Sequence, residues 1–170
     1  LVVTFFIMLG QISYAENDII VVLDPGHGGS DSGAVRGEVV EKNVNWKIAS
    51  EVKRILDQTP GITAIMTRGE NENPTLRDRG LLAKNVGADL LVSFHINSNP
   101  RSSVRGSETY ITGNVNSTRF YQASKVLGET VQNNLANIGI PKHLAMPRIK
   151  LSKDDERYSD GFITDYYGII

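Results

Sequence analysis

Three short apolar runs, separated by segments with helical periodicity, limit most strongly what this chain can fold into. The runs are Ile19–Leu23, Ile62–Thr67 and Leu90–Ile96. Continuous apolar runs of this length, bounded by polar or turn-forming residues, indicate buried strands. Because strands that alternate with helices form largely parallel sheets, the pattern predicts a single α/β domain with a largely parallel or mixed sheet flanked by helices.

Helices are predicted between and after these runs. Apolar residues recur at helical spacing over Asn43–Asp57 and again over Ser117–Ile138, as they do in helices with one buried face. Thr75, with an acid three residues later, resembles a capping box that begins a helix to about Val86. Ser107–Thr112 alternates enough to predict a further strand near a sheet edge, and Gly139–Ser159 is predicted to be a long loop.

Composition restricts the chemistry that the domain can perform. A net charge of −1 argues against bulk electrostatic binding to nucleic acid. The chain has no cysteine, which excludes a disulfide framework, a thiolate zinc site and a catalytic thiol. Any metal must therefore be held by histidine and carboxylate, and the chain has only 3 histidines.

The first fifteen residues differ from the rest of the chain. They carry no charge, and they end in Ser13-Tyr14-Ala15, with small residues at the positions that a signal peptidase recognises. Their apolar stretch is shorter than the roughly 20 residues that a membrane-spanning helix needs. We therefore expect residues 1–15 to be a partial secretory signal peptide. We expect residues 16–170 to form a domain that works outside the cytoplasm without stable membrane insertion.

Two of the histidines follow predicted strands. His27 lies in the glycine-rich loop after the first strand, and His95 lies at the end of the third. Glu41 lies where the glycine-rich loop enters its helix, on the same side of the sheet if the crossover has the usual hand. Since ligands gather at the carboxyl ends of parallel strands, these three side chains can converge as a His₂Glu zinc site.

Each of these residues also has a simpler interpretation. His27 can be a hydrogen-bonded structural residue, Glu41 can complement the helix dipole, and His95 can cap its strand. The glycine-rich loop can instead bind an anion through its backbone N–H groups. Spacing alone leaves these interpretations open.

A series of short motifs between about Ile19 and Ile138 carries a family resemblance. The motifs are Val21-Val22-Leu23-Asp24-Pro25-Gly26-His27-Gly28-Gly29, Asp31-Ser32-Gly33-Ala34, Glu41-Lys42, Met66-Thr67-Arg68, Leu76-Arg77-Asp78-Arg79, Ala88–Ser98 and Gly106-Ser107-Glu108-Thr109-Tyr110. In this order they resemble the zinc-dependent N-acetylmuramoyl-L-alanine amidases.

The resemblance implies a secreted cell-wall hydrolase with a phosphorylase/hydrolase-like α/β fold. Its partner and substrate would be peptidoglycan, in which it would cleave the amide between N-acetylmuramoyl and L-alanine, in the cell wall or in the periplasm of an envelope with an outer membrane. It implies one Zn²⁺ per chain, held by His27, Glu41 and His95, and no nucleic-acid partner; we expect a monomer. Two other classes stay open: a non-catalytic cell-wall-binding domain of the same fold, and an anion-binding module.

Further residues carry smaller expectations. Asp24 or Asn97 can orient a ligand imidazole from behind, although a turn-capping role is about as well supported. Arg68 and Arg79 can steady the loops at the sheet edge by pairing with carboxylates. His143 is expected to be an exposed residue of the long loop.

The chain is also predicted to be catalytically incomplete. The resemblance implies that the general-base glutamate lies on a late core strand beyond Ile170, so that this C-terminal core strand, and any catalytic residue on it, is missing from the chain. The other candidates do not match its context: Glu108, Glu129 and Glu156. General acid–base help is worth about 10²–10⁴ in rate, so residues 16–170 with zinc are expected to show barely detectable turnover of peptidoglycan. Turnover comparable to that of a full-length homologue, lost on Glu108→Ala or Glu156→Ala, would contradict this prediction.

Overall fold

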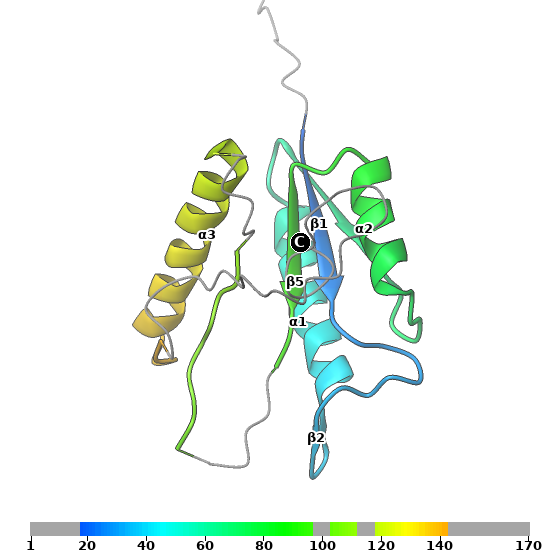
Figure 1. The fold of residues 1–170 in the computed structure, drawn as a ribbon, viewed down its shortest axis with the longest axis vertical. Coiled ribbons are helices and arrows are strands. Elements are labelled where there is room, and N and C mark those ends of the chain that lie inside the picture. The colour runs from blue at the N-terminus through cyan, green and yellow to red at the C-terminus, as the bar shows by residue number, and fades with distance from the viewer. Residues whose placement is uncertain (1–17, 97–102, 112–117, 143–170) are drawn as a thin grey trace, which may run out of the picture.

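A parallel sheet of three strands organises the part of the chain that the structure describes. This structure is a computed structural model, and it describes residues 18–96, 103–111 and 118–142. Figure 1 shows the sheet at the centre, with α1 behind it, α2 to one side and α3 apart on the other side. In chain order, the elements are β1 (Ile19–Pro25), β2 (Val35–Arg36), β3 (Val39–Val40), α1 (Glu41–Leu56), β4 (Ile62–Met66), α2 (Leu76–Asn85), β5 (Leu90–Phe94) and α3 (Thr118–Asn137).

The sheet has the order β4-β1-β5, and β1 pairs in parallel with both neighbours. Because paired residues point to the same face, the register builds apolar rows across three strands. These rows are Ile19 beside Ile62, Val21 between Ala64 and Leu90, and Leu23 between Met66 and Val92. The predicted α/β class with a largely parallel sheet is thereby confirmed.

The core forms where α1 packs on these rows. Val52 and Leu56 of α1 contact a buried cluster that includes Val21 and Leu23. Leu23 is 1% exposed, which makes β1 the best-buried strand in the described chain. This packing holds the N-terminus of α1, and therefore Glu41, near the carboxyl end of the sheet.

The opposite face of the sheet is polar at its carboxyl end. Successive strand residues alternate between faces, so Asp24 points away from the α1 side. Its carboxylate forms an ion pair of 2.9 Å with Arg79 of α2, and both residues are buried. This contact places the N-terminal half of α2 over that face.

Most of the predicted elements are confirmed, with ends shifted by one or two residues. The capping box is present, because Thr75 Oγ1 accepts a hydrogen bond from the Asp78 amide and Asp78 accepts one from the Thr75 amide. The helix predicted from Asn43 begins earlier, at Glu41, since its first amides are bonded by carbonyls of the preceding loop: Glu41 N donates to Ala34 O at 2.9 Å and Lys42 N to Ser32 O at 3.1 Å. Val40 provides no side-chain cap for that start, and the acidic Glu41 in the first turn is its local signal.

Two expectations are corrected. The stretch 107–111 forms no named strand: Ser107 makes an isolated bridge with Lys142, and α3 covers the stretch, since a Cβ at Gly128 would lie 2.8 Å from Thr109 Cγ2. Residues 107–110 are half-buried and Ile111 is buried, so exposure along the stretch does not alternate as the sequence pattern predicted. The glycine-rich loop, in turn, ends in the unpredicted β2–β3 hairpin. Residue 112 and the segment 143–170, with most of the predicted long loop, lie outside the described residues.

None of the helices within the described ranges combines the length and the apolar character that crossing a bilayer requires.

The packing predicts that the stability lost when a side chain of β1 is shortened to alanine depends on where that side chain lies. Leu23→Ala should lower the free energy of unfolding by about 2–5 kcal/mol, because it leaves a cavity between α1 and the sheet. Ile19→Ala, on the same strand but at a residue that is 52% exposed, should cost less than about 1 kcal/mol. Urea unfolding of both variants measures the difference, and equal losses would show that α1 does not seal this core.

Candidate metal centre

His27, Glu41 and His95 come together at the carboxyl ends of β1 and β5. Each offers a ligand atom, and these atoms all lie within 4.8 Å of one another. Glu41 Oε1 lies 3.3 Å from His27 Nε2 and 3.1 Å from His95 Nδ1. The two imidazole rings meet edge to face, with centroids 4.8 Å apart. The structure therefore brings together the three residues that the sequence nominated from three separate segments.

His27 is aimed by the tight loop after β1. Its backbone has a φ of 61°, a left-handed conformation that glycine adopts far more readily than histidine. Its Nδ1 donates to Asp31 Oδ2 at 2.8 Å, and this hydrogen bond, the largest influence, together with the Gly33 amide lowers the pKa of Asp31. An ionised carboxylate only accepts, so the proton of the ring resides on Nδ1. Nε2 is the ring nitrogen that faces Glu41.

Glu41 is a buried carboxylate with both oxygens in use. Oε2 accepts from the Ala34 amide at 2.8 Å, and Oε1 accepts from the Ile96 amide at 2.9 Å. Burial by itself raises the pKa of Glu41, but the two amides and the neighbouring imidazoles outweigh it, so that the pKa lies below the ordinary value. Glu41 is consequently ionised at neutral pH, which is the form that binds a metal.

His95 follows β5 and lies against the β1 loop. Its Nδ1 faces Glu41, whereas its Nε2 lies only 2.3 Å from where a Cβ on Gly26 would be. Glycine at position 26 is therefore required for the ring to lie in this orientation. The ring presents Nδ1, not Nε2, to the cluster.

The donor set fits zinc. Two ligands at about 2.05 Å from one tetrahedral zinc ion lie about 3.3 Å from each other; the two nitrogen–oxygen distances to Glu41, 3.3 Å and 3.1 Å, are close to that separation, and all three ligand atoms lie within 4.8 Å of one another. Two imidazole nitrogens and one carboxylate oxygen are a ligand set that zinc accepts, with a fourth position left for water or substrate. Asp31 supplies the supporting hydrogen bond that metal-bound histidines usually have.

The carboxylate behind His27 is Asp31, which the sequence did not single out. Asp24, which we expected to be able to orient an imidazole, instead accepts from Thr67 Oγ1 at 2.6 Å, Ser93 Oγ at 2.6 Å and Arg79. Asn97 lies outside the described residues. The spacing of four residues between His27 and Asp31 within a glycine-rich turn is the signal that could have pointed to this pair.

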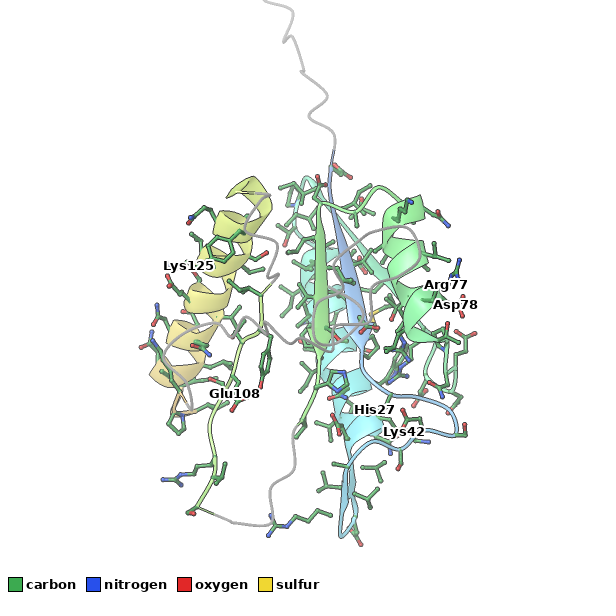
Figure 2. All side chains as sticks on the ribbon, viewed as in Figure 1. His27, Lys42, Arg77, Asp78, Glu108 and Lys125 are labelled. Carbon is green, nitrogen blue, oxygen red and sulfur yellow. The ribbon has the colours of Figure 1, made fainter. Side chains whose placement is uncertain are left out.

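The remaining candidates lie away from the cluster or outside the described chain. Figure 2 shows Glu108 near α3, whereas His27 and Lys42 lie together at the end of the central sheet. Glu108 accepts a hydrogen bond from Tyr110, and Glu129 belongs to α3. Glu156 and His143 are not among the described residues.

The glycine-rich loop does not have the form of an anion cradle. Gly26 N donates to Phe94 O at 3.0 Å and Gly28 N donates to Asp31 O at 3.0 Å, so two of its amides are already used. Its carbonyls, in contrast, accept hydrogen bonds from Arg68, Arg79 and Lys42. The loop is thus organised to place His27, which weakens the anion-binding alternative.

Known proteins resemble this chain along most of the described region. The model of a family described as N-acetylmuramoyl-L-alanine amidase matches residues 21–143. The N-acetylmuramoyl-L-alanine amidase LytC of Bacillus subtilis is 39% identical over 122 residues, which are 70% of this chain and 23% of that protein. Among solved structures, amidase AmiC2 of Nostoc punctiforme matches with a TM-score of 0.62 and 36% identity, covering 73% of this chain and 66% of that one. An amidase from Clostridium difficile 630 matches with a TM-score of 0.63 and 32% identity, over 71% and 64% of the two chains.

The chain spans only part of its curated relatives, between about a quarter and about half of their length in three of them, at 23%, 27% and 53%.

Two glycines with the same backbone conformation test the geometry of the cluster. Gly33 and Gly37 have φ values of 62° and 59°. A Cβ at Gly33 would lie 2.5 Å from His27 Cδ2 and 2.8 Å from Glu41 Oε2, whereas one at Gly37 would meet nothing within 4 Å. Both alanine variants should lose about 1–2 kcal/mol of stability to the left-handed conformation. Only Gly33→Ala should also weaken zinc binding, by at least about 10-fold, as measured by competition with a chromophoric chelator. Equal zinc affinity in the two variants would contradict the cluster geometry.

Proposed function

Because this chain belongs to the N-acetylmuramoyl-L-alanine amidase family, we propose that it contributes a zinc-dependent hydrolase domain that cleaves the amide between N-acetylmuramoyl and L-alanine in peptidoglycan. The observation that carries the proposal is the cluster of His27 Nε2, His95 Nδ1 and Glu41 Oε1 at the sheet edge. Its distances and its charge suit one Zn²⁺ per chain. The match to relatives named as amidases supports the choice of bond.

The residues of the chain have separate roles in this proposal. His27, His95 and Glu41 supply three ligands, and the single carboxylate partly neutralises the charge of the ion. Asp31 keeps the proton of His27 on Nδ1, so that Nε2 is available. The Ala34 and Ile96 amides hold the Glu41 carboxylate in place. When bound, zinc supplies a Lewis acid that polarises a carbonyl oxygen and lowers the pKa of water towards about 7.

A carboxylate must also take the proton of the attacking water and pass it to the leaving amine. We assign this role to none of the described carboxylates near the cluster, because Glu41 is a ligand and Asp31 is held by His27. The expectation that a later glutamate is the general base stays a prediction.

We further propose that residues 16–170 are the catalytic domain and that residues 1–15 direct it out of the cytoplasm, because its polymeric substrate lies in the cell envelope. Peptidoglycan is then its partner, in the extracellular wall or the periplasm. Exposed loops around the cluster, among them the β2–β3 hairpin that directly precedes Glu41, would meet the polymer first.

One experiment tests both which bond is hydrolysed and whether hydrolysis needs the three proposed zinc ligands. Purified peptidoglycan is incubated with zinc and a version of the domain that includes the predicted general-base glutamate, and new amino termini of L-alanine and new reducing sugar ends are quantified separately. New alanine amines are expected, and a chelator should abolish them. His27→Ala and Glu41→Gln should lower the signal to background, because two ligands rarely hold zinc against buffer.

Matched controls separate ligand loss from surface change. His143→Ala removes the third imidazole of the sequence, and Glu51→Gln removes the carboxylate of an exposed ion pair with Arg54 on α1; both should retain the zinc content and the activity of the parent chain. New reducing ends without new alanine amines would mean a glycosidase and overturn the proposal. Binding to peptidoglycan with stoichiometric zinc but without new amines would favour the non-catalytic wall-binding alternative.

A further inference from the structure

The loop that carries His27 is held through its main-chain carbonyls. Each carbonyl from residue 25 to residue 29 accepts a hydrogen bond, and all but one of them accept from a side chain. The donors are Arg68 Nε at 2.7 Å and Arg79 Nη1 at 3.0 Å to Pro25 O, Asn45 Nδ2 at 3.2 Å and Arg68 Nη2 at 3.3 Å to Gly26 O, Arg79 Nη2 at 2.9 Å to His27 O, the Asp31 amide at 2.8 Å to Gly28 O, and Lys42 Nζ at 2.6 Å to Gly29 O.

This loop needs external support. His27 has a φ of 61°, and the two glycines after it have φ values of 139° and 47°. A left-handed conformation costs a residue with a side chain roughly 1–2 kcal/mol, and such conformations persist only when the surroundings hold them. If His27 relaxed, its Nε2 would leave its position 3.3 Å from Glu41 Oε1, and the cluster would lose a ligand.

Arg79 is the donor that acts on His27 itself. It projects from the first turn of α2, directly after the capping box, and is 3% exposed. Its Nη2 donates to His27 O, while its Nη1 donates to Pro25 O and to Asp24 Oδ1. One planar guanidinium therefore joins the end of β1 to the carbonyl of the candidate ligand.

Asp24 fixes the orientation of this guanidinium. The carboxylate is 1% exposed, and Thr67, directly after β4, and Ser93 of β5 donate to its two oxygens. A buried ion pair is retained at low cost only when its remaining hydrogen-bonding capacity is met, which is the case here. The Arg79 guanidinium is thus held by a buried carboxylate of β1 while it donates to the loop carbonyl of His27.

We propose that Arg79 is a positioning residue for the metal site: by holding the His27 carbonyl, it keeps the His27 imidazole in the orientation that binds zinc. This inference rests on the proposed function in so far as the cluster is a zinc site. A lysine at position 79 keeps the positive charge beside Asp24, but its single ammonium cannot reproduce the planar fork that reaches two carbonyls as well.

Zinc affinity, measured separately from folding, tests the role. The full chain and its Arg79→Lys variant are stripped of metal, and urea unfolding gives the stability of each. The zinc dissociation constant is then measured by competition with a chromophoric chelator, at a temperature at which both are folded. We expect Arg79→Lys to raise this constant by about 10- to 100-fold, the usual effect of removing a group that supports a metal ligand.

Lys53→Met is the matched control. Lys53 is also a basic side chain that donates to a main-chain carbonyl, Ala64 O at 2.8 Å. It lies in the last turn of α1, and Ala64 belongs to β4, which carries none of the three candidate ligands. The Lys53→Met variant should have a lower free energy of unfolding than the parent chain and the same zinc affinity. If Arg79→Lys does not fold, Asp24→Asn removes the charge that orients the guanidinium and should weaken zinc binding in the same direction by a smaller factor.

The outcomes separate this inference from the proposed function. Parent-like zinc affinity in folded Arg79→Lys, or in Asp24→Asn where Arg79→Lys does not fold, overturns the positioning role and leaves the metal site intact. Equal weakening in Lys53→Met would mean that Arg79 acts only through stability, which also overturns it. A parent chain that binds no zinc refutes the metal site and this inference together.

Discussion

Parallel pairing of β1 with β5 is the constraint on which the candidate metal site depends. The register sets Pro25 beside Phe94, so the chain leaves both strands at one edge and delivers His27 and His95 to the same place. The bond from Gly26 N to Phe94 O continues the pairing into the loop. Because a strand rises about 3.3 Å per residue, a shift of the register by two residues would move one histidine by about 6.6 Å and separate the ligands.

The two faces of this sheet do different work. The face under α1 is apolar and supplies the packing that orders the strands, with Val21 and Leu23 at its centre. The other face places Asp24, flanked by Thr67 and Ser93, beneath Arg79. Burying an ion pair adds little net stability. The contribution of the Asp24–Arg79 pair is therefore to fix the position of Arg79, which holds the loop that bears His27.

Local signals were sufficient where an element is specified by its own residues. The capping box at Thr75 predicted the start of α2, and the apolar runs predicted β1, β4 and β5 to within two residues at each end. They failed where the partner is distant. The start of α1 at Glu41 depends on loop carbonyls, and the stretch 107–111 packs against α3 at Gly128 without forming a strand. Asp31 was missed because an acid in a glycine-rich turn has many uses, of which the fold selects one.

By itself, the sequence determined the α/β class, the order of most elements and the identity of His27, Glu41 and His95 as candidate ligands, because hydrophobic periodicity and short motifs are local properties of the chain. Only the tertiary structure decided which nitrogen each imidazole presents, which carboxylate stands behind His27, and that Arg79 bonds to the carbonyl of His27. The contacts of His95 with Glu41 and of Arg79 with His27 span 54 and 52 residues of sequence, and they exist only once parallel strands and their crossover helices have brought the segments together. The contact of His27 with Asp31 spans four residues, and it depends on the conformation that the loop adopts.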